Sequence, residues 1–276
     1  MDAKAATQGA ATARAASGGR SEAASATWAE AGSACRRGAP AVLPFGALEQ
    51  HGPHLPLSTD TIMAAWLSEK VADAVDGWLL PAVPLGDTSA NDGFPGTVTL
   101  SFDTVRAIAT DVGRSLKRTG FPCLIIVNGD WGNRAALGQA ARDLAAGGWP
   151  VLVVDYPGLA EVASAVCETP AAGAGFYHAD EVETSAVLAL HPELVHMELA
   201  VAGYPEMPAT LGSTPTDLSR LSPSGVFGDP RPATATKGHA ILDALADRAV
   251  ELVRSFLAGV AATGTGGPAT TPVTPK

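Results

Sequence analysis

The run Cys123-Leu124-Ile125-Ile126-Val127 leads directly into Asn128-Gly129-Asp130-Trp131-Gly132-Asn133. The unbroken apolar run predicts a strand that is buried on both faces, which is typical of a parallel sheet covered by helices on both sides. The strand ends abruptly at a polar, glycine-rich turn, and helical spacing follows through Ala146. A buried strand, a turn and a helix in this order indicate an α/β protein.

Similar units occur on both sides of this run. Short apolar strands are expected over 41–45 and 151–154, with a further apolar run over 78–83 and a β-branched strand over 97–100. Helices are expected over 60–75, from a cap at Ser101 or Asp103 to a C-terminal glycine at Gly120, and in the last part of the chain. The alternation predicts a three-layer α/β/α sandwich with a mostly parallel central sheet.

The last helix carries one apolar stripe with steps of three and four residues, which predicts a core-facing side. The residues of this stripe are Leu242, Leu245, Ala249, Leu252 and Phe256.

The chain reads as one domain with a tail at each end. Residues 1–26 are rich in Ala, Gly, Ser and Thr and lack large apolar residues up to Ala26, so they are predicted to be disordered. Residues 263–276 have a similar composition and the same prediction. No composition break interrupts residues 27–262, which are therefore predicted to form a single domain.

Composition excludes some classes of partner. The formal charge of −10 argues against a nucleic-acid or anionic-membrane partner, since both require a basic face. No apolar segment is long enough to span a membrane, and the start of the chain lacks the apolar centre of a secretory signal, so we expect a cytoplasmic protein. The three cysteines have no CxxC spacing, which suits structural thiols in a reducing compartment.

The segment from Glu49 to Asp60 carries most of the chemistry. It places two carboxylates and two imidazoles after a buried strand, where such groups are costly unless they bind something. Glu49 and His51 are two residues apart and leave an extended chain on the same face. Asp60 returns at the start of the next helix. A polar loop with an ordinary helix cap at Asp60 is the alternative.

Two other polar clusters follow strand ends or begin helices, namely Asp130 and the segment with His178, Glu181 and Glu183. Open α/β sheets place their ligands at such positions, so we expect the clusters to converge. Several carboxylates with imidazoles and no thiolate suit Zn²⁺, Mn²⁺ or Fe²⁺, and crowded carboxylates do not stay ionised without a cation. One or two ions are compatible with this set, and a bridging Asp between two ions is a natural arrangement.

Other catalytic arrangements find less support. The sequence has no GxSxG elbow, no P-loop and no dinucleotide fingerprint. Paired carboxylates of the glycosidase type remain open. His191, His196 and His239 are expected to be surface or satisfied core residues.

The chain resembles the creatininase (creatinine amidohydrolase) family over most of its predicted domain. The resemblance rests on the segments 44–60 (PFGALEQHGPHLPLSTD), 94–97 (FPGT), 128–129 (NG) with the strand before it, 178–185 (HADEVETS) and 224–230 (SGVFGDP). It implies a metal-dependent hydrolase with ligands at Glu49, His51 and Glu183 and a bridging ligand at Asp60, and it places the histidine of the fourth motif at His178. It also implies a homo-oligomer, often a hexamer.

The chain departs from the family pattern at three places. The family motif NGHGGN carries a ligand histidine where this chain has Asp130, which we expect to act as a harder ligand. A histidine usual before the second motif is absent, and Asn91 and Asp92 lie there instead. Asp180 replaces the usual glycine of the fourth motif.

The leading hypothesis is a metal-dependent amidohydrolase that cleaves a C–N amide bond of a small molecule with a metal-activated water. His178 is predicted to shuttle the proton or to steady the oxyanion, and Trp131 and Asn133 are predicted to contact the substrate. Two alternatives remain open. The altered loop around Trp131 is compatible with an amide-forming or acyl-transfer enzyme, and the lost histidine with a catalytically silent homologue.

Overall fold

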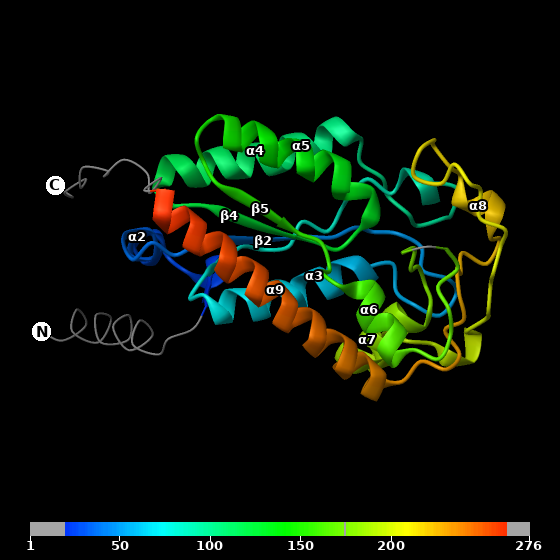
Figure 1. The fold of residues 1–276 in the computed structure, drawn as a ribbon. Helices are drawn as coiled ribbons and strands as arrows, with labels where there is room; N and C mark the ends of the chain where they lie inside the picture. Colours follow the sequence, from blue (N-terminus) through cyan, green and yellow to red (C-terminus); the bar gives the residue numbers. More distant parts are fainter. Residues whose placement is uncertain (1–19, 174, 264–276) are drawn as a thin grey trace, which may run out of the picture.

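The computed structural model describes residues 20–173 and 175–263. Its centre is a sheet with the strand order β1-β3-β2-β4-β5, and every pairing in it is parallel (Figure 1). The strands are β1 (Ser21–Glu22), β2 (Ala41–Phe45), β3 (Trp78–Leu79), β4 (Leu124–Asn128) and β5 (Val151–Val154). The structure confirms the predicted α/β sandwich.

Helices cover both faces of the sheet. Helices α4 and α5 lie on one side, and α3 and α9 lie on the other, as Figure 1 shows. The α-helices are α2 (Trp28–Arg36), α3 (Thr59–Ala74), α4 (Phe102–Thr119), α5 (Arg134–Ala146), α6 (Leu159–Val166), α7 (Glu181–Leu190), α8 (Leu218–Leu221) and α9 (Ala235–Thr263). Short 3-10 helices are η1 (Ala23–Ser25), η2 (Ser89–Asn91), η3 (Trp131–Asn133), η4 (Pro192–Leu194) and η5 (Met197–Leu199).

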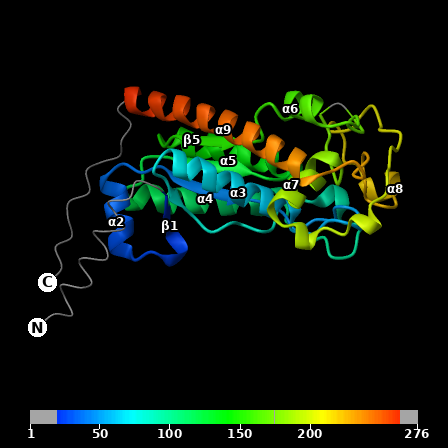
Figure 2. The ribbon, with the colours of Figure 1, turned by 90° about the horizontal axis from the view of Figure 1, so that it is seen from below.

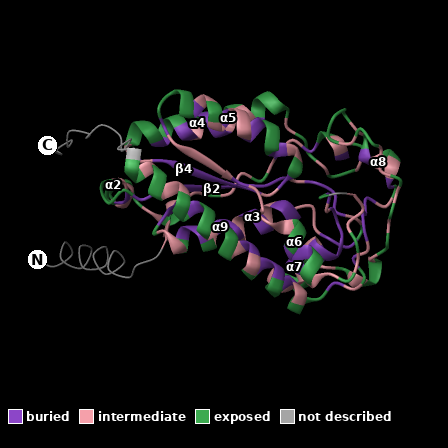
Figure 3. Cartoon of the chain, in the orientation of Figure 1, coloured by how far each residue is buried: buried purple, intermediate pink, exposed green. Residues whose placement is uncertain are grey.

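The central strand β4 explains why both faces need cover. Successive side chains of a strand point to opposite faces. Leu124 and Ile126 accordingly pack in the cluster with Leu137 of α5, whereas Ile125 and Val127 pack in the cluster with the residues of α3 and α9. All residues of β4 are buried, and Figure 3 shows the two central strands as the buried layer of the molecule.

Local signals set the ends of α4 as predicted. The hydroxyl of Ser101 accepts a hydrogen bond from the N–H of Thr104, so Ser101, rather than Asp103, is the N-cap. Gly120 ends the helix with a φ of 100°, a left-handed conformation that glycine adopts without a Cβ penalty.

Some elements differ from the expectation. Residues 97–100 form isolated bridges from Val98 to Leu48 and from Thr99 to Gly86 rather than a strand. In α9, Leu252 is 39% exposed, whereas Val253 is fully buried. The buried stripe therefore steps by four residues after Ala249, and the adjacent apolar pair Leu252-Val253 offered no sign of which residue faces inward.

Residues 20–26, predicted to belong to a disordered tail, are part of the folded chain. Ser21 and Glu22 pair in parallel with Trp78 and Leu79 of β3. Arg20 fixes this segment through ion pairs to Asp73 at 2.8 Å and Glu69 at 3.3 Å. The ion pairs of Arg20 and the strand pairing of Ser21 and Glu22 therefore hold the segment in place, although it buries little apolar surface. Residues 1–19 and 264–276 of the predicted tails lie outside the described residues.

The carboxyl ends of β2, β4 and β5 point toward the end of the molecule that holds α8 and the long loops (Figures 1 and 2). Parallel strands bring the residues that follow each of them to one edge, which prepares a site there. None of the helices in the described part of the chain is long and apolar enough to cross a membrane.

Candidate metal centre

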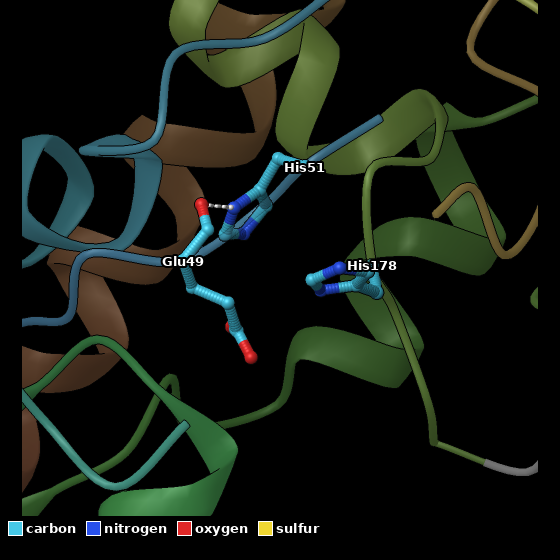
Figure 4. A group of neighbouring side chains, drawn as sticks. All are labelled: Glu49, His51 and His178. Carbon is cyan, nitrogen blue, oxygen red and sulfur yellow. Dashed lines mark hydrogen bonds between the residues drawn. The ribbon is translucent and has the colours of Figure 1, made fainter. Parts of the chain in front are cut away.

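His51 lies fully buried after β2 and points its ring into a group of carboxylates. Its Nδ1–H donates a hydrogen bond to the backbone oxygen of Glu49 at 3.0 Å, as Figure 4 shows. The other ring nitrogen, Nε2, lies 3.3 Å from Asp60 Oδ1 and 3.6 Å from Glu183 Oε2, without hydrogen-bond geometry. In the neutral ring this lone pair faces two carboxylates, so only a proton or a metal cation satisfies it.

Asp60 lies between two groups of possible ligands. Ligand atoms of His51, Asp60 and Glu183 lie within 4.8 Å of one another, and so do those of Glu49, Asp60 and Asp130. Asp60 Oδ2 and Asp130 Oδ2 are buried and have no hydrogen-bond partner. A carboxylate shared by two groups, with an unpartnered oxygen, has the geometry expected of a bridging ligand.

Buried carboxyls in this cluster resist ionisation. Burial and the charge of Asp60 raise the pKa of Glu49 to about 7, against the lowering effect of His51. Burial raises the pKa of Glu183 to about 8, with Asp60 contributing. Burial and the charges of Glu49 and Asp60 raise the pKa of Asp130 well above its ordinary value. The carboxyls of this cluster therefore need a positive charge nearby if all of them are to be ionised at the same time.

The donor set fits divalent metal ions. The carboxyls of Glu49, Asp60, Asp130 and Glu183 carry a charge of −4 when ionised, which two divalent ions (2 × +2) would balance. Oxygen and imidazole donors without thiolate suit borderline or hard ions. An ion would bind to the buried atoms that have no hydrogen-bond partner, which are His51 Nε2, Asp60 Oδ2 and Asp130 Oδ2.

Local backbone features aim these ligands. Gly129 lets the end of β4 approach the start of α3, since a Cβ there would lie 2.3 Å from the backbone oxygen of Asp60. The residue that replaces the family glycine, Asp180, caps α7 by accepting from the N–H groups of Val182 and Glu183. Glu183 in turn accepts from the N–H of Ala179 at 2.6 Å, which turns its carboxylate back toward His51.

His178 enters the same space from the segment before α7, and its ring centroid lies 4.4 Å from that of His51 (Figure 4). Ligand atoms of Glu49, His51 and His178 lie within 4.8 Å of one another. Burial and the neighbouring His51 lower the pKa of His178 well below its ordinary value, so the ring is neutral.

A buried amide network connects His178 to Glu49. Asn91 Nδ2 donates to Glu49 Oε1 at 2.6 Å, and Gln50 Nε2 donates to Asn91 Oδ1 at 3.1 Å. Gln50 Oε1 accepts from the N–H of Gly52, which fixes the orientation of its amide. Gln50 Nε2 therefore donates to His178 Nε2 at 2.7 Å, so the neutral His178 carries its proton on Nδ1.

A cavity of about 710 Å³ opens onto the cluster. Trp131 lines it and meets Phe176 edge to face, with ring centroids 6.3 Å apart. Further lining comes from the loop with Asp87 and Asn91 and from the segment before α8. The walls are therefore partly aromatic, and Glu49, Asp60, Asp130 and Glu183 are among the lining residues.

The structure brings most of the predicted site residues together. Glu49, His51, Asp60, Asp130 and Glu183 form the carboxylate and imidazole cluster, with His178 beside it. Trp131 lies in the cavity wall, as expected, and is 42% exposed.

Two residues of the predicted segments serve other purposes. Asn133, predicted to contact the substrate, is fully buried; its amide accepts from the N–H of Asp87 and donates to the oxygen of Gly46. The amide thus holds the loop after β4 and is not available to a ligand. Glu181 turns away from the cluster and pairs with Lys237 of α9 at 2.5 Å.

Three residues of the site were not predicted to belong to it, although Asn91 was noted where the family usually has a histidine. Gln50 and Asn91 form the amide network, and nothing in the sequence indicates that the loops carrying them meet. Tyr156 lines the cavity just after β5. The change from the apolar run 151–154 to polar residues is the same signal that identified Asp130, and it could have indicated Tyr156.

Known proteins resemble this chain over most of its length. The family model described as "Creatininase: Creatinine amidohydrolase" matches residues 24–253. The mycofactocin precursor peptide peptidase of Mycobacterium ulcerans (strain Agy99) is 32% identical over 232 residues, which cover 79% of this chain and 86% of the relative. The creatinine amidohydrolase of Pseudomonas putida is 27% identical over 228 residues, or 77% of this chain and 88% of the relative.

The fold is also similar to solved structures. A mutant creatininase of the Zn-Zn type superposes with a TM-score of 0.76 at 26% identity, over 85% of this chain and 97% of that one.

Proposed function

The chain belongs to the creatininase family, and from this premise we propose that it hydrolyses a C–N amide bond of a small molecule with divalent metal ions held at the carboxyl edge of its sheet. The observation that carries the proposal is the buried set of His51 Nε2, Asp60 Oδ2 and Asp130 Oδ2, which have no hydrogen-bond partner among the described residues. Uncompensated buried polar atoms are costly, so a ligand is the simplest reason for keeping them.

Glu49, His51, Asp60, Asp130 and Glu183 would hold the ions, with Asp60 shared between two positions. Bound there, divalent ions would activate a water molecule as the nucleophile and polarise the amide carbonyl. The Nδ1–H bond from His51 to the oxygen of Glu49 keeps the ring in the tautomer whose Nε2 is a ligand atom.

His178 would shuttle the proton or steady the oxyanion. Its Nε2 is unprotonated and accepts a hydrogen bond from Gln50, and one of its ring nitrogens lies within 4.8 Å of ligand atoms of Glu49 and His51. The two amide hydrogens of Gln50 face three acceptors, namely His178 Nε2, Asn91 Oδ1 and the oxygen of Gly225. The amide donor lies 2.7 Å from Nε2, so this nitrogen can take up a proton only after Gln50 turns away, whereas the proton on Nδ1 can donate a hydrogen bond to the oxyanion.

The donor set favours zinc, manganese or iron over calcium or magnesium, since it includes an imidazole. Two ions per chain are the better match to four carboxylates.

The test combines metal analysis with hydrolysis assays on a panel of small amides that includes creatinine. Glu49→Gln and Asp60→Asn should lose bound metal and hydrolysis, because each removes an ionised ligand. Glu193→Gln is the matched control, since Glu193 is exposed and pairs only with the exposed His191. Metal-free wild-type protein, or full hydrolysis by both ligand variants, would refute the proposal.

Hydrolysis of a short peptide is a second candidate. Two observations favour it, the 32% identity to a peptidase and the cavity of about 710 Å³, a size that encloses drug-sized ligands. Short peptides therefore belong in the substrate panel, and cleavage of a peptide without hydrolysis of any other amide would favour this candidate.

The amide-forming and catalytically silent alternatives receive less support. Trp131 is 42% exposed and does not seal the cavity against water, as an amine nucleophile would require. A silent homologue has no need of the unpartnered ligand atoms around His51 and Asp60. Product analysis with and without an added amine separates hydrolysis from amide formation.

We also propose a cytoplasmic homo-oligomer. The three cysteines are free thiols, as expected in a reducing compartment. Large apolar residues such as Leu199, Val201 and Tyr204 are exposed on one stretch of chain and could pack against a second copy. Sedimentation velocity would test the assembly.

A further inference from the structure

The side-chain amide of Gln50 is fixed in one orientation by two backbone groups. Its Oε1 accepts from the N–H of Gly52 at 2.9 Å, and its Nε2 donates to the oxygen of Gly225 at 3.1 Å. Exchanging the two ends of the amide would set a donor against a donor and an acceptor against an acceptor. Backbone groups cannot exchange these roles, so Gln50 Nε2 is the atom that lies 2.7 Å from His178 Nε2.

This contact allows only one form of the His178 ring. An amide nitrogen donates hydrogen bonds and does not accept them, so a proton on His178 Nε2 would find no acceptor in Gln50. Nε2 is therefore the acceptor, and the neutral ring carries its proton on Nδ1. Nδ1 has no hydrogen-bond partner among the described residues, and it is not one of the fully buried atoms. Because His178 lines the cavity, its Nδ1–H is open to a ligand there.

The segment 224–230 contacts both members of this pair, although none of the predicted metal ligands lies in it. Gly225 has a φ of 73°, and a Cβ there would lie 1.8 Å from Gln50 Oε1, so a side chain at this position would displace the amide. The N–H of Phe227 donates to the backbone oxygen of His178 at 3.0 Å, and its ring meets the His178 ring edge to face, with centroids 5.9 Å apart. One short segment therefore holds the amide and the imidazole against each other.

We propose that Gln50 is a positioning residue that holds His178 as a neutral Nδ1–H donor, so that His178 stabilises the oxyanion of the reacting amide and does not act as a base. The inference rests on the proposed function, and it decides between the two roles open to His178. A donor that is oriented before the reaction stabilises the charge of the transition state without reorganisation. The proton stays on Nδ1, so His178 exchanges no proton with the substrate.

The first test measures the tautomer of His178 by NMR of the full chain with ¹⁵N-labelled histidine, both metal-free and loaded with zinc. The signals of His178 are those that His178→Asn lacks. The wild type should show a neutral ring with its proton on Nδ1. Gln50→Met should place at least part of the protons on Nε2, because methionine offers a weak acceptor where glutamine offers a donor.

Gln139→Met is the matched control for this measurement. Gln139 lies on α5 outside the cavity and bonds to Asp143 and Arg142, so its replacement should leave the tautomer of His178 as it is in the wild type. A proton on Nε2 in the wild type would overturn the inference. An unchanged Nδ1 tautomer in Gln50→Met would overturn it as well, since Gln50 would then not be the group that fixes the ring.

The second test separates a donor from a base with an amide that the wild type hydrolyses. His178→Ala should lower kcat about 100- to 1,000-fold with little change in KM, as expected for loss of a donor to the oxyanion. His178→Asn should keep at least about a tenth of the wild-type kcat, because its amide nitrogen can donate from the place of Nδ1 but cannot take up a proton. Equal losses of kcat in the two variants would identify His178 as a base and overturn the inference.

A double-mutant cycle tests whether Gln50 acts through His178. Gln50→Met should lower kcat at least about tenfold in the wild type, and it should change kcat less than about twofold in His178→Ala. Additive losses would show that Gln50 acts independently of His178, which would refute its positioning role and leave the proposed function intact. Absence of wild-type hydrolysis on every amide tested would refute the proposed function instead, and the tautomer measurement would then decide on Gln50.

Discussion

Asp130 occupies the position where the family motif carries a ligand histidine. Its Oδ1 accepts from the N–H of Gly132 and caps η3, whereas its Oδ2 is buried without a partner near Glu49 and Asp60. One carboxylate thus combines a structural bond with a free ligand atom. The exchange of histidine for aspartate adds a negative charge to the cluster and keeps a donor atom in reach of an ion.

Asp130→Asn separates these two roles, because the amide oxygen still accepts from Gly132 but the charge is lost. We expect the affinity for zinc to fall by at least about 10- to 100-fold, which is the loss found when a residue that only supports a metal ligand is changed. The metal-free variant should be at least as stable as the wild type, since burial and like charges raise the pKa of Asp130 and oppose its ionisation. Zinc titration with a competing chelator and urea unfolding measure the two effects.

Asp111→Asn provides the control for this change, since Asp111 is exposed on α4 and pairs only weakly with Arg114 at 3.8 Å. It should alter neither zinc affinity nor stability. If Asp130→Asn bound zinc like the wild type, Asp130 would not be a ligand.

Helices α7 and α9 are tied by a buried ion pair close to the site. Lys237 Nζ donates to Glu181 at 2.5 Å and to Glu168 at 2.7 Å, and the Glu181 side chain is only 1% exposed. Glu181 also accepts from the N–H groups of Glu168 and Thr169, so it joins α7, α9 and the loop after α6. Although burial raises the pKa of Glu181, the bond from Lys237 and those from the loop lower it overall.

Lys237→Met should therefore destabilise the protein by about 3 kcal/mol, because it leaves a buried carboxylate without its cation. Arg114→Met is the matched control, since its ion pair is exposed and should contribute under about 1 kcal/mol. Urea unfolding of both variants checks the difference. Equal losses would mean that the backbone donors alone compensate Glu181.

The sequence predicted elements better than the contacts between them. The apolar run 124–127 and the cap at Ser101 are local signals, and both elements formed as predicted. The prediction of which side of α9 faces inward was wrong at Leu252. Two adjacent apolar residues do not indicate which of them faces the core of a long helix. The bond from Asn91 to Glu49 depends on the path of a loop, which propensity and periodicity do not determine.

The same limit applied to the candidate site. Residue types at strand ends indicated the carboxylate cluster, since parallel strands deliver their carboxyl ends to one edge. They did not distinguish Asn133, whose amide holds the backbone of Gly46 and Asp87, from a residue that faces a ligand. Burial and partners, which only the folded chain defines, make that distinction.

At the scale of the whole molecule, the acidic cluster should make stability depend on metal and pH together. Without metal, the raised pKa values of Glu49, about 7, and Glu183, about 8, mean that the folded state binds more protons than the unfolded one. The stability that these protonated groups contribute is fully present below about pH 4.5, and it is lost as the pH rises through 7 and 8.

Saturating zinc should reverse this trend, because the ion requires the ionised carboxylates and protons compete with it. The gain in the melting temperature on adding zinc should therefore grow as the pH rises from about 5 to 8. A free zinc concentration of 100 times Kd would correspond to about 2.7 kcal/mol of added stability. Thermal unfolding at a series of pH values, with chelator or with zinc, measures the gain, and Glu183→Gln should diminish both the loss without metal and the gain with it. A zinc effect of equal size at every pH would mean that ion binding does not depend on ionisation of these carboxyls, and that the ion binds elsewhere on the chain.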